Sequence, residues 1–399
     1  MSSPIIRQPK RDSLRVLMTN WIYSPEYGGG ARQCQLLVRH LKQKGVEVEV
    51  VARTRQKRLL GQTIVDGVRV TRVPDANGQL ASRMRTAAAL VAELTRRYRW
   101  ADVVHMHGFM PEVTLAARMA GQKVVQKVTL VGLDDASSLQ KRKSGAVAAW
   151  IARMADAVVG PSQAAIVSSL VGGIPAHRLW SIPNGVDLGR FRPATELEKR
   201  TLRQSLGLDR KAFLVVFVGG LERRKGLDVA IRAIALARSK GLRPVQLLVL
   251  GVSPESLANC PFGKELSEIV ARHQLDSVVN FLGVKENVEE YLRCADVFVL
   301  PSRAEGQPNA LLEAMACRLA CVARTLPGVT DELLLPGRRG YLVDDDEAAG
   351  FAGALVELAE AKELRAAFGA QARAYVERHH DIRHVAEAYR TLYRMLVES

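Results

Sequence analysis

Short apolar runs alternate with longer stretches of helical periodicity from Leu14 to the end of the chain. The runs are rich in Val, Leu and Ile and are bounded by Gly, Pro, Asn and Asp, which is typical of buried strands between turns. This alternation predicts open sheets of mostly parallel strands. The predicted strands are 14–19, 46–53, 102–107, 123–130, 157–160, 213–218, 245–250, 278–282, 297–300, 320–324 and 340–343.

Helical periodicity fills most of the intervals between these strands. An extended excursion is predicted over 63–73 instead of a helix, and the final helix has one apolar face. The predicted helices run from Gly30 to about 44, over 79–98, from about 135 to 154, over 227–240, from 309, from about 347, and over 383–397.

The most informative stretch follows the apolar run 297–300. A polar loop carries Glu305, and Pro308 then suits the first turn of a helix. The amides of Asn309, Ala310 and Leu311 are expected to be free at the positive end of this helix, where phosphate binds well. Glu313 lies one turn beyond Asn309 on the same helix face. Because carboxylates repel phosphate, the two glutamates fit sugar and ribose hydroxyl groups better, although a solvated loop glutamate and a helix-pairing glutamate are the simpler alternative.

This stretch resembles the EX7E motif of the retaining GT-B glycosyltransferases of family 4, with Glu305 and Glu313 at the required spacing. The resemblance extends over nearly the whole chain. It implies an α/β fold of GT-B type, in which two Rossmann-like domains with parallel sheets face each other across an interdomain cleft. It also implies that Glu313 holds the ribose and Glu305 the transferred sugar of a nucleotide-sugar donor, and that the reaction retains the anomeric configuration.

A second cluster of interest follows the strand 213–218, where the turn reads Gly-Gly-Leu-Glu-Arg-Arg-Lys-Gly. Cationic groups between a strand and a helix suit a diphosphate. Lys225 matches the lysine that the family carries in this turn, whereas Gly220 stands where the family usually has an arginine. We expect Arg223 or Arg224 to supply the missing phosphate contact.

Two further candidates lie in the first half of the chain. His107 ends the strand 102–107, and ligands of open parallel sheets bind at the carboxyl ends of strands; family members similarly carry a histidine here. His107 is preferred over His105 because it is nearer the strand's end. The glycines Gly29 and Gly30 open the first helix and permit close approach of a ligand to the backbone, or they simply tighten a turn.

The pentapeptide Pro-Asn-Gly-Val-Asp at 183–187 is similar to the family's interdomain junction and contains a strong turn signal. The expected organisation is therefore an acceptor-side domain at 1–187 and a donor-binding domain at 188–378. By resemblance, the helix in 379–399 crosses back onto the first domain.

Composition narrows the setting of the reaction. Residues 1–188 hold 27 Lys and Arg against 13 Asp and Glu, while the rest of the 399-residue chain holds 30 against 28. A basic first half suits an anionic membrane, an anionic substrate or nucleic acid. The five cysteines lack metal-like clustering. Three clusters of basic residues are candidates for lipid contact. The clusters are Arg53, Arg55, Lys57 and Arg58; Arg96, Arg97 and Arg99; and Lys141, Arg142 and Lys143.

These observations predict a metal-independent glycosyltransferase without a cofactor, which uses a nucleotide-sugar with uridine or guanosine as the expected base. The acceptor is expected to be a saccharide or a lipid-linked saccharide of cell-surface polymer or glycolipid synthesis. The N-terminal stretch lacks the apolar core of a signal peptide, so we expect a cytoplasmic protein, peripheral on the inner face of the membrane.

Two other classes of protein remain as alternatives at this point. A GT-B-like nucleotide-sugar epimerase would use the same nucleotide grip, and transfer to an acceptor would exclude it. A nucleic-acid-binding protein would explain the net charge of +16, but only 5% of residues are aromatic and no binding motif is evident. The sugar, the acceptor and the linkage are not encoded in any recognisable pattern.

Overall fold

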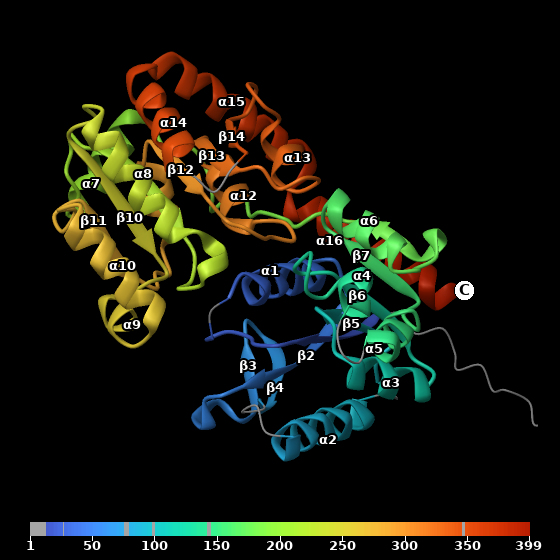
Figure 1. Ribbon diagram of the computed structural model, residues 1–399. Helices are drawn as coiled ribbons and strands as arrows, with labels where there is room; N and C mark the ends of the chain where they lie inside the picture. The colour runs from blue at the N-terminus through green and yellow to red at the C-terminus, as the bar shows by residue number, and fades with distance from the viewer. Residues whose placement is uncertain (1–12, 27, 76–79, 98–99, 142–144, 345–347) are drawn as a thin grey trace, which may run out of the picture. The chain divides into compact units, whose positions relative to one another are not determined.

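The computed structural model describes residues 13–26, 28–75, 80–97, 100–141, 145–344 and 348–399. The chain folds into two compact units. The first unit combines residues 1–127, 144–158 and 386–399, and the second combines 128–143 and 159–385. Figure 1 shows the elements of each unit by colour and label.

The first sheet has the strand order β3-β4-β2-β1-β5-β6-β7-β8. Its pairs β1–β2, β1–β5, β2–β4 and β5–β6 are parallel, while β3 pairs antiparallel with β4. The strands are β1 (Arg15–Asn20), β2 (Glu47–Thr54), β3 (Gly61–Val65), β4 (Val68–Pro74), β5 (Val103–His107), β6 (Lys123–Lys127), β7 (Ala157–Gly160) and β8 (Leu179–Ser181).

The first half differs from the sequence prediction in several places, and the helices Pro111–Met119 and Gln163–Val171 were not predicted. The predicted extended excursion is the antiparallel hairpin β3–β4. The single helix predicted to end near Met154 is two helices, α4 and α5, since the segment has no sustained amphipathic period. The elements are α1 (Gly29–Gln43), η1 (Lys57–Leu59), α2 (Leu80–Arg97), α3 (Pro111–Met119), α4 (Ala136–Gln140), α5 (Gly145–Ala152), α6 (Gln163–Val171) and η2 (Ala176–Arg178).

The second sheet has six strands in the order β11-β10-β9-β12-β13-β14, and all of its pairs are parallel. The predicted bounds of four of its strands, 213–218, 245–250, 297–300 and 320–324, agree with the structure. The strands are β9 (Phe213–Val218), β10 (Val245–Leu250), β11 (Val279–Gly283), β12 (Val297–Leu300), β13 (Ala320–Arg324) and β14 (Tyr341–Val343).

Helices cover both faces of the second sheet because successive strand residues point to opposite sides. Val215 and Phe217 of β9 pack with α8, α10 and α14, whereas Leu214 and Val216 pack with α11, α12 and α15. The expected parallel α/β architecture is thus confirmed. The remaining helices of the chain are α7 (Glu196–Ser205), η3 (Arg223–Lys225), α8 (Leu227–Ser239), α9 (Pro254–Ala258), α10 (Pro261–Arg272), α11 (Val288–Cys294), α12 (Asn309–Ala316), α13 (Thr330–Leu334), α14 (Ala348–Glu360), α15 (Lys362–His379) and α16 (Ile382–Glu398), and α16 from Ala386 onward belongs to the first unit.

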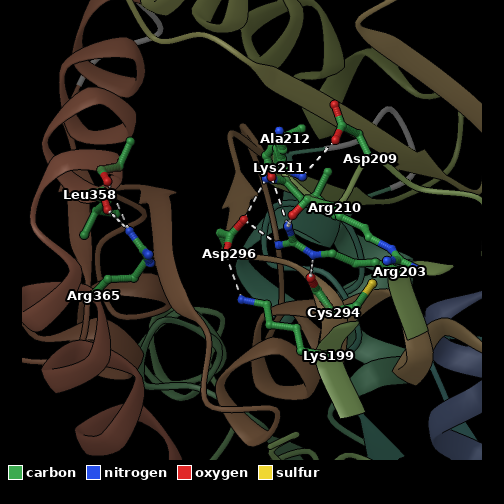
Figure 2. A network of polar contacts seen from close by, with 12 residues as sticks. Lys199, Arg203, Asp209, Arg210, Lys211, Ala212, Cys294, Asp296, Leu358 and Arg365 are labelled. Carbon is green, nitrogen blue, oxygen red and sulfur yellow. Dashed lines mark hydrogen bonds and ion pairs between the residues drawn. The ribbon is translucent and has the colours of Figure 1, made fainter. Parts of the chain in front are cut away.

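A buried carboxylate holds the amino ends of β9 and β12 together (Figure 2). Asp296 accepts hydrogen bonds from Nζ of Lys199 at 2.7 Å, a guanidinium nitrogen of Arg203 at 2.7 Å and the amide of Leu214 at 2.9 Å. Burial would raise the pKa of Asp296, but the two cations hold that pKa below its ordinary value. The two central strands are thereby fixed at one end, so their opposite, carboxyl ends lie at defined positions.

Candidate functional site

The carboxyl ends of β9 and β12 bring two turns of the second unit together. Because β12 pairs with β9, the Gly219–Gly226 turn and the loop that begins at Pro301 lie side by side. Gly226 has a positive φ of 70°, and a Cβ built on it would lie only 2.1 Å from the carbonyl oxygen of Pro301. Only glycine therefore allows the two turns to approach so closely.

Three predicted site residues meet in this place. Nζ of Lys225 donates a hydrogen bond to Oε1 of Glu305 at 2.6 Å, and a guanidinium nitrogen of Arg224 lies 3.7 Å from Oε2 of the same carboxylate. The Glu305 side chain is only 8% exposed, and that of Lys225 is 18% exposed. Such a charge-assisted contact away from water is stronger than an ordinary surface ion pair. One carboxylate and two cations therefore form a single cluster.

A second ion pair joins Arg303 of the loop to Asp228, which lies on α8 directly after the Gly219–Gly226 turn. The guanidinium of Arg303 donates to both oxygens of Asp228, at 3.2 and 3.1 Å, and to the carbonyl of Arg223 at 2.6 Å. The amide of Arg303 also donates to the carbonyl of Arg224 at 2.7 Å. The orientation of the Arg224 and Lys225 side chains is thus supported by backbone contacts from the neighbouring loop.

The two candidate arginines point in different directions. The Arg223 guanidinium pairs with Glu265 at 2.5 Å and lies 4.6 Å from the ring centre of Phe262, both on α10. Arg224 instead pairs with Glu222 at 2.7 Å and approaches Glu305. Gly220 is exposed, and a Cβ there would have only Glu222 Oε1 nearby, at 3.6 Å. Of the two arginines, Arg224 is the one that lies beside Glu305, so it is the candidate for the contact expected in place of Gly220.

The start of α12 is fixed by an asparagine from the predicted hinge. The side chain of Asn184 donates to Oδ1 of Asn309 at 2.8 Å and to the carbonyl of Gln307 at 3.1 Å. The backbone N–H of Asn184 donates to Oε1 of Gln307 at 2.6 Å. The helix begins at Asn309, so Pro308 lies just before the first turn.

The amino end of α12 differs in one respect from the expectation of three free amides. The amide of Leu311 already donates to the carbonyl of Pro308 at 3.1 Å, because the first turn is tight. Ala310 is half-buried, and Glu313, on the next turn, is half-buried as well. The amino end of this helix therefore offers fewer donors to an anion than the sequence suggested.

His107 of the first unit lies in a buried polar cluster. In the sheet register it is paired with Lys127, and its ring centre lies 4.6 Å from that of His105. His105 is hydrogen-bonded through Nδ1 to the hydroxyl of Tyr393 at 2.6 Å. Burial, with smaller contributions from His105 and Lys127, holds the pKa of His107 well below its usual value. His107 is consequently neutral at ordinary pH.

Several polar atoms of this cluster have no hydrogen-bond partner among the residues that the structure describes. They include Nε2 of His105, Nε2 of His107, Nζ of Lys127 and the hydroxyl of Tyr389. Burial lowers the pKa of Lys127 to about 8, and its Nζ lies 5.7 Å from the ring centre of Tyr389. His107 is the last residue of β5, as expected, and both rings are buried, so the choice between His107 and His105 as the site residue stays a prediction.

The two glycines of the first helix are exposed at its amino end. Gly29 is its first residue, and a Cβ built on Gly30 would meet no atom of the described chain within 4 Å. Packing within the described residues therefore does not require glycine at position 30, and close approach of a ligand to the backbone there stays a prediction.

The basic clusters of the first half are less uniform than the sequence suggested. Arg53 is buried beside Glu112 and Asp75, and Arg97 binds Glu49 and Glu93, so neither is available to lipid. Arg99, Arg142 and Lys143 lie outside the described residues. The exposed cations of the three clusters are Arg55, Lys57, Arg58, Arg96 and Lys141.

Four supporting residues of the site were not singled out from the sequence as site residues. Asn184, Asp228, Arg303 and Gln307 hold the two turns through contacts between distant segments. The signals that could have indicated them are the place of Asn184 in the pentapeptide at 183–187 and that of Gln307 between Glu305 and Glu313. Within the described part of the chain, no group of three or more His, Cys, Asp or Glu could hold a metal, and no helix there is long and apolar enough to span a membrane.

The fold is similar to that of solved structures. The Anabaena protein HepE, solved with UDP and glucose, superposes with a TM-score of 0.78 at 20% identity, over 96% of this chain and 100% of HepE. Two parallel α/β sheets with this similarity define a GT-B glycosyltransferase fold.

The family follows from sequence comparison. The model of "Glycosyltransferase Family 4" matches residues 27–190, and that of "Glycosyl transferases group 1" matches residues 212–361. The D-inositol 3-phosphate glycosyltransferase of Actinosynnema mirum is 30% identical over 357 residues, which cover 83% of this chain and 84% of the relative. The enzyme of the same name from Acidothermus cellulolyticus is 28% identical over 379 residues, or 88% and 83% of the two chains. The chain belongs to glycosyltransferase family 4 and is a glycosyltransferase.

Proposed function

We propose that this enzyme transfers a sugar from a nucleoside diphosphate to a hydroxyl group of an acceptor, with retention of configuration and without a metal ion. The observation that carries the proposal is the cluster of Lys225, Arg224 and Glu305 at the carboxyl ends of β9 and β12. It combines cations for a diphosphate with a carboxylate for sugar hydroxyls in one place.

The chemistry assigned to these residues is electrostatic. As the bond between the sugar carbon and the diphosphate oxygen breaks, its electron pair stays on the diphosphate. The acceptor oxygen bonds to the sugar carbon and gives its proton to the departing diphosphate. Lys225 and Arg224 stabilise the charge that develops on the leaving diphosphate, and fixed donors of this kind give the largest catalytic contribution in many enzymes. Glu305 holds the sugar hydroxyls and Glu313 the ribose, and neutral His107 contributes a hydrogen bond without becoming charged.

The donor can be identified by thermal stabilisation, because a bound ligand raises the melting temperature by mass action. We expect one of UDP-glucose, UDP-N-acetylglucosamine, GDP-mannose and ADP-glucose to raise it in the wild type and to raise it less in Glu313→Ala. Stabilisation by none of these donors would contradict the proposed donor class.

The product and the metal requirement are tested with the donor found in this way. The proton spectrum of the product should show the anomeric configuration of the donor, and transfer should continue in EDTA. An inverted product, or loss of transfer in EDTA that Mn²⁺ or Mg²⁺ restores, would contradict that part of the proposal. Because the curated relatives are named for D-inositol 3-phosphate, this polyol phosphate belongs in the acceptor panel beside mono- and disaccharides.

We further propose that a lipid-linked saccharide is the acceptor and that the enzyme binds the cytoplasmic face of a membrane. Exposed cations support this part: Lys57 and Arg58 of η1 are followed by Leu60 and Ile64, which are 41% and 67% exposed. Each basic residue near anionic lipid contributes about 1 kcal/mol. The wild type should bind vesicles that contain phosphatidylglycerol but not neutral vesicles.

The matched variants distinguish this surface from a general charge effect. Replacing Lys57 and Arg58 with Ala should weaken vesicle binding, whereas replacing Lys240 and Arg243, which lie in the second unit, should not. If the wild type ignores both kinds of vesicle, the acceptor must be sought among water-soluble molecules.

A further inference from the structure

The β1–α1 loop of the first unit exposes a tryptophan at the carboxyl edge of the sheet. Trp21 directly follows β1, and its residue surface is 46% exposed. The large apolar residues of β1 itself, Leu17 and Met18 among them, are fully buried. An exposed indole at the edge where parallel sheets bind ligands is an apolar surface available to a ligand.

One face of the ring is covered by a cation that is itself held in place. The guanidinium carbon of Arg53 lies 4.1 Å from the ring centre of Trp21. Arg53 is 7% exposed, contacts Glu112, and lies 3.8 Å from a carboxylate oxygen of Asp75. Because this arginine is fixed from two sides, it holds the indole in one orientation with the opposite face turned away from it.

The backbone on either side of the ring is fixed as well. Oδ1 of Asn20 accepts a hydrogen bond from the amide of Trp21 at 2.8 Å, and Nδ2 of Asn20 donates to the carbonyl of Gly30 at 3.3 Å. Tyr23 is fully buried, and Arg72 donates to the carbonyl of Ser24. An exposed ring that is already ordered loses little entropy when a ligand covers it.

The chemistry of a sugar fits such a surface. One face of a pyranose ring carries several C–H groups, which pack against the electron-rich face of an indole while the hydroxyl groups remain at the rim. The groups proposed to hold the donor belong to the second unit, so the ring in the first unit is available to the other sugar of the reaction. We propose that Trp21, backed by Arg53, is a stacking platform for a pyranose ring of the acceptor. This inference rests on the function proposed above.

Intrinsic fluorescence tests the platform without knowledge of the acceptor. D-glucose, D-galactose and D-mannose serve as probes, and glycerol serves as a polyol without a ring face. A protein in which Trp100, Trp150 and Trp180 are Phe keeps Trp21 as its one tryptophan. We expect a saturable change in its emission with at least one hexose and none with glycerol.

Variants of the otherwise native chain guard against a folding defect. Trp21→Phe should abolish the response, while Trp150→Phe, which alters a more exposed indole on α5, should preserve it. An unchanged response in Trp21→Phe, or no saturable response of the wild type to any of the three sugars, would overturn the platform. A response only to phosphatidylglycerol vesicles would overturn it too and assign Trp21 to lipid contact.

Kinetics separate failure of the platform from failure of the proposed function. With an acceptor found in the panel, Trp21→Ala should raise the acceptor KM by about tenfold and leave the donor KM unchanged, and Trp21→Phe should raise it less. Active enzyme with an unchanged acceptor KM in Trp21→Ala would overturn the platform alone. Absence of transfer from every donor in the wild type would overturn the proposed function, while the hexose titration would still decide the platform.

Discussion

The carboxyl edges of the two sheets differ in how their buried titratable side chains are accommodated. At the edge of the second sheet, charges are paired: Lys225 with Glu305, and Arg303 with Asp228. At the edge of the first sheet, Lys127 and His107 are buried, and Nζ and Nε2 of these residues have no hydrogen-bond partner within the described chain. At the second sheet, oppositely charged side chains pair with one another. At the first sheet, burial disfavours the charged forms of Lys127 and His107.

This difference predicts what a ligand must do at each edge. A diphosphate at the second sheet would find cations already ordered by carboxylates and would compete with Glu305 for Lys225. A polar ligand at the first sheet would meet groups whose desolvation cost has been met during folding. Substitutions should therefore affect catalysis most strongly at the second edge and stability most strongly at the first.

The largest effect is expected from Lys225→Ala. Removing the cation takes away a fixed donor to the leaving diphosphate and leaves the Glu305 carboxylate without its closest partner. Turnover should fall by about 10²-fold or more. Single-turnover rates with a saturating donor measure this, and Lys264→Ala, a lysine on α10, is the matched control. An unchanged rate would remove Lys225 from the catalytic cluster.

The next effect is expected in stability, from Lys127→Met. Burial lowers the pKa of Lys127 from 10.5 to about 8. Between these two values the unfolded chain binds more protons than the folded chain, so the free energy of unfolding rises with pH through that window. At pH 7 both states are protonated and the full cost of about 3 kcal/mol is present.

Lys127→Met should therefore be more stable than the wild type at pH 7, and the advantage should shrink as the pH rises from 8 toward 10.5. Urea titrations at several pH values measure it, with Lys57→Met, an exposed residue, as the control. An advantage that does not depend on pH would mean that Lys127 has the same pKa in the folded and the unfolded chain.

A smaller effect is expected at the two glutamates, and the two should differ in kind. Glu313→Ala should raise the donor Kd by about tenfold through loss of the ribose contacts, with a lesser change in turnover. Glu305→Gln should lower turnover by a similar factor, because it touches the reacting sugar and Lys225. Titration calorimetry and initial rates separate the two. Wild-type behaviour of both variants would contradict the assigned roles.

The smallest effect is expected at the two arginines of the turn. Arg224→Ala should lower turnover several-fold, because its guanidinium approaches Glu305, whereas Arg223→Ala should change little, because Arg223 binds Glu265. Gly220→Arg should be tolerated, since there is room for a side chain, and should restore activity to Arg224→Ala. If both alanine variants are as active as the wild type, no arginine compensates for Gly220.

The sequence predicted the fold well where local pattern decides structure. Continuous apolar runs between turn residues placed β9, β10, β12 and β13, since a central parallel strand is buried on both faces. It was less accurate where the helical pattern is weak, as in the segment predicted as one helix that contains α4 and α5.

The site was predicted in its residue types but not in its contacts. The spacing of residues in the sequence indicated Glu305 and Lys225 as site residues. Their hydrogen bond at 2.6 Å, however, depends on the pairing of β9 with β12. The burial of Arg53 and the different orientations of Arg223 and Arg224 depend on partners distant in the sequence. Charge counted along a chain says little about which cations reach solvent.

The close approach at Gly226 has a consequence for protein engineering. The Gly219–Gly226 turn and the loop from Pro301 fit each other through the Pro301 carbonyl and the Arg303–Asp228 ion pair, so neither can be exchanged alone. In a chimera that takes only one of these segments from a relative, the imported segment would not fit the native segment that it contacts. Donor preference should therefore transfer between family members only when segments 219–228 and 301–313 are moved together, as a single cassette.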